Sequence, residues 1–166
     1  MAAILIRWLI FIHVLSALTF YMAHGTSVAM TFKLRKETDF ARIRAMLDLS
    51  WSTMVVMGVS FLIMGLTGIA LPFMIHIWNK IWIWASIVLM LFTFIYMAMF
   101  NESHYKQLRR LVGLPYMIGS KQVPAEPHSS PEEVVTLLNK TNITGLAVAG
   151  YVIPAIVLWL MVFKPF

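Results

Sequence analysis

Four stretches of this sequence are apolar enough and long enough to cross a lipid bilayer as helices. They cover roughly residues 3–31, 50–71, 77–100 and 143–163, and none of them contains an Asp or a Glu. Each reaches the ~20 residues that a helix needs to cross about 30 Å of hydrocarbon. The sequence therefore predicts an all-α, polytopic membrane protein: four transmembrane helices in an up-down bundle, with residues 1–166 forming one domain.

Composition excludes several kinds of chemistry. The chain is 60% hydrophobic and has no cysteine, which excludes disulfides, thiolate metal sites and cysteine nucleophiles. Spans without carboxylates do not suit proton pumps or ion-coupled carriers, which place Asp or Glu at membrane depth. The sequence also has no phosphate-binding glycine loop, zinc-protease motif or serine-hydrolase elbow. We therefore assign no catalytic residue and no metal site. The sequence favours a protein that is not an enzyme and leaves the question open.

Basic residues distinguish the two sides of the membrane. Ten Lys and Arg residues lie in the loops at about 33–49 and 101–141, against three elsewhere. The positive-inside rule places both loops in the cytoplasm and both termini outside. We expect the plasma membrane of a bacterium. The net charge of +6 is explained by anionic lipid head groups, so the lipid bilayer, and not nucleic acid, is the expected partner.

The two cytoplasmic loops are expected to contain short interfacial helices. In the first, Asp39 is a candidate cap, and an apolar face follows at helical spacing: Phe40, Ile43, Met46 and Leu47. In the second, Ser130 is a candidate N-cap, followed by Pro131 and, three residues after the cap, Glu133. This pattern predicts a helix that continues to about Asn139.

Prolines and tryptophans add local expectations within the spans. Pro72 is expected to end the second span, and Pro154 predicts a kink in the fourth. Trp78, Trp82 and Trp84 are expected to form an aromatic belt at the outer head-group level.

Histidines are the best candidates for cofactor binding. His13 and His24 are eleven residues apart, so on a helix they project from nearly the same face, about 16 Å apart along the axis. Stacked histidines on one helix are how membrane cytochromes hold two haems. His76 and His104 are weaker candidate partners near the two interfaces. The alternative is that His13 and His24 bond only to hydroxyls or carbonyls of neighbouring helices, with Ser16, Thr19, Ser52 and Thr53 available.

Methionines and tyrosines suit ligands other than haem. Thirteen methionines, with Met74 and His76 facing outward, suggest Cu(I), although methionine is also a common packing residue. Tyr21, Tyr96 and Tyr151 carry hydroxyls that suit a quinone carbonyl. Apolar surfaces of this kind also suit a pigment or a lipid.

The segment Arg7–Ala17 (RWLIFIHVLSA) resembles the opening helix of the copper-resistance-D-like superfamily of small four-helix membrane proteins. This superfamily includes uncharacterised members and haem-b membrane protoporphyrinogen oxidases. In these families a basic segment follows a first-helix histidine, and Lys33–Glu37 (KLRKE) is similar to that segment. The resemblance implies that His13 is a haem ligand.

Three functions follow from these observations. The first is a non-catalytic accessory subunit of a larger membrane-embedded, bioenergetic complex engaged in electron transport. The second is a haem-b protein that acts in electron transfer or in porphyrin or quinol oxidation. The third is a protein for permeation of copper or a small solute, which the lack of intramembrane carboxylates disfavours.

Overall fold

The computed structural model describes residues 1–100, 104–119 and 121–165, and it confirms an all-α fold with four candidate spans. The first three spans are α1 (Ala2–Leu34), α2 (Phe40–Met74) and α3 (Ile81–Phe100). The fourth consists of α6 (Ile143–Ala147), the π-helix η2 (Val148–Val152) and α7 (Ile153–Phe163). The smaller elements are α4 (Lys106–Leu111), β1 (Tyr116–Ile118), β2 (Lys121–Val123) and α5 (Pro131–Asn139).

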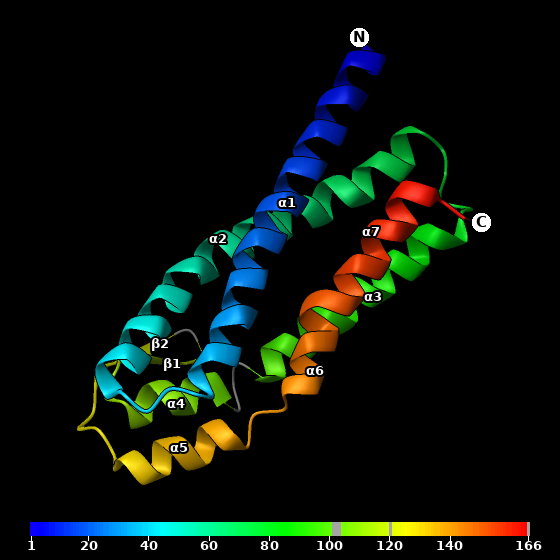
Figure 1. Cartoon of the computed structure of the whole chain (residues 1–166). Helices are drawn as coiled ribbons and strands as arrows, with labels where there is room; N and C mark the ends of the chain where they lie inside the picture. The colour runs from blue at the N-terminus through cyan, green and yellow to red at the C-terminus, as the bar shows by residue number, and fades with distance from the viewer. Residues whose placement is uncertain (101–103, 120, 166) are drawn as a thin grey trace.

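The four spans are arranged as two helix pairs. Helix α1 packs along α2, and α3 packs along α7. The pairs are joined where α1 meets α6 and η2. Figure 1 shows the N-terminal end of α1 projecting away from the other helices, while its C-terminal half approaches the fourth span.

The second span is longer than the sequence suggests. Phe40–Met74 is one continuous helix of 35 residues, so the segment after Asp39 is not a separate interfacial helix. Asp39 does cap it, because its Oδ1 accepts a hydrogen bond from the Ala41 amide at 2.8 Å. Neither proline nor glycine interrupts residues 40–57, and the helix therefore continues into the span.

Pro72 lies inside α2 and does not end it. A proline removes only its own N–H donor, so the following turn can still form. The Ile75 amide donates to the Leu71 carbonyl at 3.0 Å and completes that turn. Consequently α3 begins at Ile81, and Trp78 lies in the turn between the two helices.

A helical cap covers the end of the bundle where α1 terminates. We define the cap as the first ten residues of α2 (40–49) together with α4, the β1–β2 hairpin and α5. It encloses an apolar core that consists of Leu34, Ile43, Leu47, Tyr105, Leu108, Val112, Leu114, Val134 and Leu138. The predicted start of α5 is confirmed: the Ser130 hydroxyl accepts from the Glu133 amide. The hairpin, which pairs Tyr116 with Val123, was not predicted.

The fourth span is irregular beside Pro154. The five residues before Ile153 form a π-helix, in which each backbone hydrogen bond joins residues five apart and not four apart. Pro154 has no N–H to donate to the preceding turn, and a π-turn is one way for a helix to accommodate that loss. Ala149 and Gly150 of η2 are buried and face α1.

Candidate functional site

His13 is part of the contact between α1 and α2. Its Nδ1 lies 3.0 Å from the Met64 carbonyl oxygen and 3.0 Å from Thr67 Oγ1. The Thr67 hydroxyl is within hydrogen-bond distance of two carbonyl oxygens of its own helix, Ile63 at 2.7 Å and Met64 at 3.1 Å. Because the Met64 carbonyl oxygen can only accept, Nδ1 carries the proton and donates it to this oxygen, which leaves Nε2 as the ring nitrogen with a free lone pair.

Gly68 makes room for the His13 ring. A Cβ at Gly68 would lie 3.0 Å from His13 Cε1, which is closer than nearly all real Cβ contacts. Glycine at this position therefore lets the imidazole rest against the α2 backbone. Four hydroxyl residues were predicted as possible partners of the histidines, but Thr67 and Gly68 were not among them. In the sequence, these two residues are distinguished only as a threonine followed directly by a glycine in the second span.

His24 is enclosed between α1 and η2. Its side chain is 2% exposed and stacks on Phe20, with ring centroids 5.4 Å apart and planes 9° apart. The ring hydrogen-bonds to the backbone of Ala149. Its Nε2 has no hydrogen-bond partner among the described residues. His24 thus anchors α1 to the irregular turn of the fourth span.

The four candidate histidines lie in four different surroundings. His13 and His24 share α1 but contact different helices, α2 and η2. His76 is exposed in the α2–α3 turn with φ of 55°, and His104 stacks on Phe100 at 5.3 Å. Within 1–100, 104–119 and 121–165, no group of three or more His, Cys, Asp or Glu side chains has a geometry that could hold a metal ion.

The donor arrangement of His13 fits a histidine that would hold a haem iron. Metal-binding histidines commonly donate one ring N–H to a backbone carbonyl and bind the metal through the other nitrogen. His13 is half-buried and has this arrangement through the Met64 carbonyl. His24 has the same anchoring, but its ring is covered by Phe20 and η2 and does not offer the space a porphyrin needs. His13 is therefore the residue that would hold a haem.

The three candidate quinone-binding tyrosines make contacts between helices. The Tyr21 hydroxyl donates to Met90 Sδ at 3.4 Å, and the Tyr151 hydroxyl donates to the Gly25 carbonyl at 3.1 Å. The Tyr96 hydroxyl occupies the position where a Cβ of Gly145 would lie. Each of these tyrosines therefore has a clear packing role.

A buried polar cluster in the cap was missed at the level of sequence. Arg109 is only 3% exposed. Its guanidinium donates to the Pro115 carbonyl at 2.7 Å, the Leu47 carbonyl at 3.1 Å and Asp48 Oδ1 at 3.0 Å. It also lies 4.6 Å from the centroid of the Trp51 ring. The only sequence signal was an Asp–Trp pair three residues apart at the start of a span, which is not specific.

Tyr105 belongs to the same cluster. Its hydroxyl donates to the Leu47 carbonyl at 2.6 Å, so that this carbonyl accepts from both Tyr105 and Arg109. Burial raises the pKa of Tyr105 above its ordinary value. Among the described residues, the cluster has no buried side-chain nitrogen or oxygen without a hydrogen-bond partner, as expected of a structural element of the cap.

Comparison with known proteins gives no family assignment: no family profile, characterised protein or solved structure matches the chain. The fold alone defines the class, a protein with four helices long and apolar enough to span a membrane, compatible with a multi-pass membrane protein.

Proposed function

We propose that this protein is a non-catalytic accessory subunit of a larger membrane-embedded complex, of the bioenergetic, electron-transfer kind. The observation that carries the proposal is the small buried share of its spans. In the most apolar part of each helix, 11% of α1, 17% of α2, 17% of α3 and 33% of the fourth span are buried. A chain with so little contact among its own spans offers most of their surface to lipid and to other helices.

The N-terminal half of α1 is the clearest example. The five buried residues of this helix are Ser16, Phe20, His24, Val28 and Leu34, so residues 2–15 include none of them. Large apolar side chains of the first half are exposed, including Trp8 at 60% and Phe11 at 55%. Apart from the contacts of His13 with α2, this part of the helix is open and is suited to packing against another subunit.

Helix α2 offers a surface for close helix packing. A Cβ at Gly58 or at Gly65 would meet nothing within 4 Å. These glycines are seven residues apart and therefore lie on one face of the helix. Small residues let helices approach closely in lipid, where packing replaces the hydrophobic effect as the source of association.

Three buried hydroxyls inside the spans favour a non-catalytic role. Ser16, Thr67 and Ser86 each donate to the carbonyl four residues earlier in their own helix. Such bonds satisfy hydroxyls in an apolar medium without contributing to a reactive group.

A haem-b protein is the second candidate, and His13 is the observation that favours it. Its Nδ1–H is committed to the Met64 carbonyl, which leaves Nε2 as a potential ligand. When bound, the haem would supply one-electron chemistry. Met64, Thr67 and Gly68 would hold the His13 imidazole in its orientation.

Purification from the native membrane in mild detergent tests the first candidate. We expect stable partner chains to co-purify with the tagged protein. Gly65→Leu should remove them while the isolated chain stays folded, because Gly65 has open space around it. Val59→Leu, which also enlarges a side chain at an exposed position of α2 but lies about 100° around the helix from Gly58, serves as the matched control. Isolation of the wild-type chain alone would contradict the accessory-subunit proposal.

A reduced-minus-oxidised visible spectrum of the same sample tests the second candidate. A stoichiometric haem band that disappears in His13→Ala and persists in His76→Ala would establish haem binding through His13. A featureless spectrum of a sample with intact partners would eliminate the haem proposal and leave the accessory-subunit proposal standing.

A further inference from the structure

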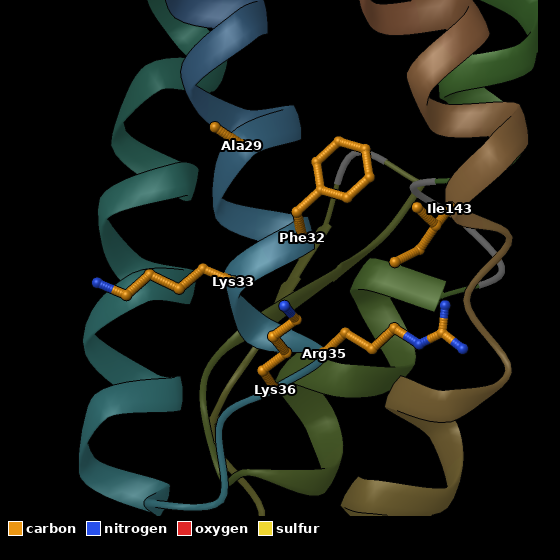
Figure 2. Close-up of a pocket in the computed structure, with 6 residues that line it drawn as sticks. All are labelled: Ala29, Phe32, Lys33, Arg35, Lys36 and Ile143. Atoms are coloured by element: carbon orange, nitrogen blue, oxygen red, sulfur yellow. The ribbon is translucent and has the colours of Figure 1, made fainter.

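A basic crevice lies where α1 ends and the fourth span begins. It encloses about 630 Å³ and is lined by Ala29, Phe32, Lys33, Arg35, Lys36 and Ile143. Figure 2 shows Arg35 extending from the end of α1 toward the connection between α5 and α6, and Phe32 lying on the side of α1 that faces Ile143. Lys33 extends from the other side of α1 (Figure 2).

No carboxylate of the described residues neutralises the cations of this crevice. Lys33, Arg35 and Lys36 are exposed, and none of them forms an ion pair with a carboxylate of the described residues. The nearest acidic residue in the sequence, Glu37, is engaged elsewhere. It pairs with Arg42 at 3.9 Å and accepts from the amides of Thr38 and Asp39. The crevice therefore has an uncompensated positive charge.

The other wall of the crevice is apolar and continues along the spans. Phe32 stacks on Tyr151 of η2, with ring centroids 6.4 Å apart. Ile143 is the first residue of α6, so the wall follows both α1 and the fourth span away from the cap. A ligand that filled the crevice would contact cations at one end and hydrocarbon at the other.

We infer that this crevice is a binding site for the head group of an anionic phospholipid, with Arg35 and Lys36 on the phosphate and an acyl chain along Phe32, Tyr151 and Ile143. The position of the crevice, at the end of a membrane span, is the depth at which phospholipid phosphates lie. Basic pockets between transmembrane helices are a recurring form of lipid head-group site. A soluble phosphate would use the cations but not the apolar wall, so the pairing of the two surfaces points to a lipid.

Native mass spectrometry of the purified full-length chain in mild detergent tests the site. Phosphatidylglycerol and phosphatidylcholine are titrated in parallel, because they differ in head-group charge. We expect retention of phosphatidylglycerol to exceed that of phosphatidylcholine. Arg35→Gln with Lys36→Gln should reduce it by about tenfold to thirtyfold, since each basic residue near an anionic head group contributes about a factor of five. Lys80→Gln with Lys121→Gln removes the same charge from exposed positions outside the crevice and should have no effect.

Two further measurements distinguish a phospholipid from free phosphate as the ligand of the crevice. Inorganic phosphate at the same concentration should not displace the phospholipid. Phe32→Ala should weaken retention of phosphatidylglycerol, because it shortens the apolar wall while it keeps the charge. Equal retention by the Arg35 and Lys36 variant and by the wild type would overturn the site. Displacement by inorganic phosphate would overturn the lipid as its occupant.

Discussion

At the scale of single residues, Arg109 is a tightly held side chain. It is buried in the cap and bonded to two backbone carbonyls and to Asp48, and it also packs on Trp51. A buried guanidinium is tolerated only when its donors are satisfied. Arg109 thus ties α4 to α2 and fixes the cap on the end of the second span.

Replacing Arg109 should therefore loosen the cap. We expect Arg109→Gln to lower the free energy of unfolding by about 2–3 kcal/mol, through the loss of charge-assisted hydrogen bonds and of the contact with Trp51. Thermal unfolding in detergent, followed by tryptophan fluorescence, measures the change. Arg44→Gln is the control, since Arg44 is exposed and makes one long hydrogen bond, 3.4 Å, to the Gly113 carbonyl. Equal effects of the two substitutions would show that burial of Arg109 adds nothing.

Tyr105 makes the cap less stable as the pH rises through the alkaline range. Burial raises its pKa above the ordinary value of 10.0, so the folded state holds the phenolic proton more tightly than the unfolded state does. The associated stability is fully present below pH 10.0 and is lost as the pH rises from there through the pKa of the folded state. We expect the unfolding temperature of the wild type to fall over this range.

Tyr105→Phe separates this effect from other alkaline titrations. The variant should be less stable at pH 8 by about 1 kcal/mol, because the Leu47 carbonyl loses one donor. Its unfolding temperature should fall less steeply than that of the wild type above pH 10. Parallel curves for the two proteins would show that Tyr105 does not titrate with unfolding.

At the scale of elements, the junction of α1 with η2 holds the two helix pairs together. Gly150 lies against Val28, and a Cβ at Gly150 would be 2.7 Å from one Val28 methyl and 3.0 Å from the other. Val28 is only 1% exposed and has a stiff, branched side chain, so it has little room to move. The close approach of the two elements depends on glycine at this position.

We expect Gly150→Ala to separate α1 from η2 and to cost about 1–3 kcal/mol, the range typical of overpacking a filled interface. Gly58→Ala is the matched control, because a Cβ at Gly58 meets nothing within 4 Å. Hydrogen exchange of the α1 amides in detergent micelles measures the effect. Faster exchange in the second half of α1 is expected for Gly150→Ala alone, and unchanged exchange would mean that Val28 yields without cost.

The elements also show what a single sequence can predict. Hydropathy and length locate all four spans, because crossing hydrocarbon requires a long uninterrupted apolar helix. Ser130 and Asp39 act locally, and the caps predicted for them are confirmed in α5 and α2. Pro154 directly follows the start of α7, next to the π-helix η2. The sequence did not predict that the loop helix continues into α2. A helix continues wherever no stop signal interrupts it, and residues 40–57 contain neither proline nor glycine.

Contacts between distant segments were much harder to predict. The bond of His13 to Met64 joins residues 51 positions apart, and the bond of Arg109 to Leu47 joins residues 62 positions apart. Helical spacing places His13 and His24 on one face of α1, but the face alone does not say which helix each ring meets. The different neighbours follow from the tertiary arrangement of the two helix pairs, which spacing along one helix does not determine.

At the scale of the whole molecule, the cap gives the protein two unlike ends. One end holds the packed core, the hairpin and the basic crevice, while the other consists of helix termini and the short α2–α3 turn (Figure 1). Ten of the thirteen basic residues lie in residues 33–49 and 101–141, the segments at the cap end of the chain. The positive-inside rule predicts that this end faces the cytoplasm.

Orientation can be measured directly because the chain has no cysteine. Asn79→Cys and Gln122→Cys place single thiols at exposed positions of the α2–α3 turn and of β2, without changing the charge of either loop. In intact cells, a membrane-impermeant thiol reagent should label Asn79→Cys and should reach Gln122→Cys only after permeabilisation. Permeabilised cells control for reactivity, since both thiols are exposed and should then react alike. The reverse pattern would place the cap outside, and the crevice at the end of α1 would then face the outer leaflet.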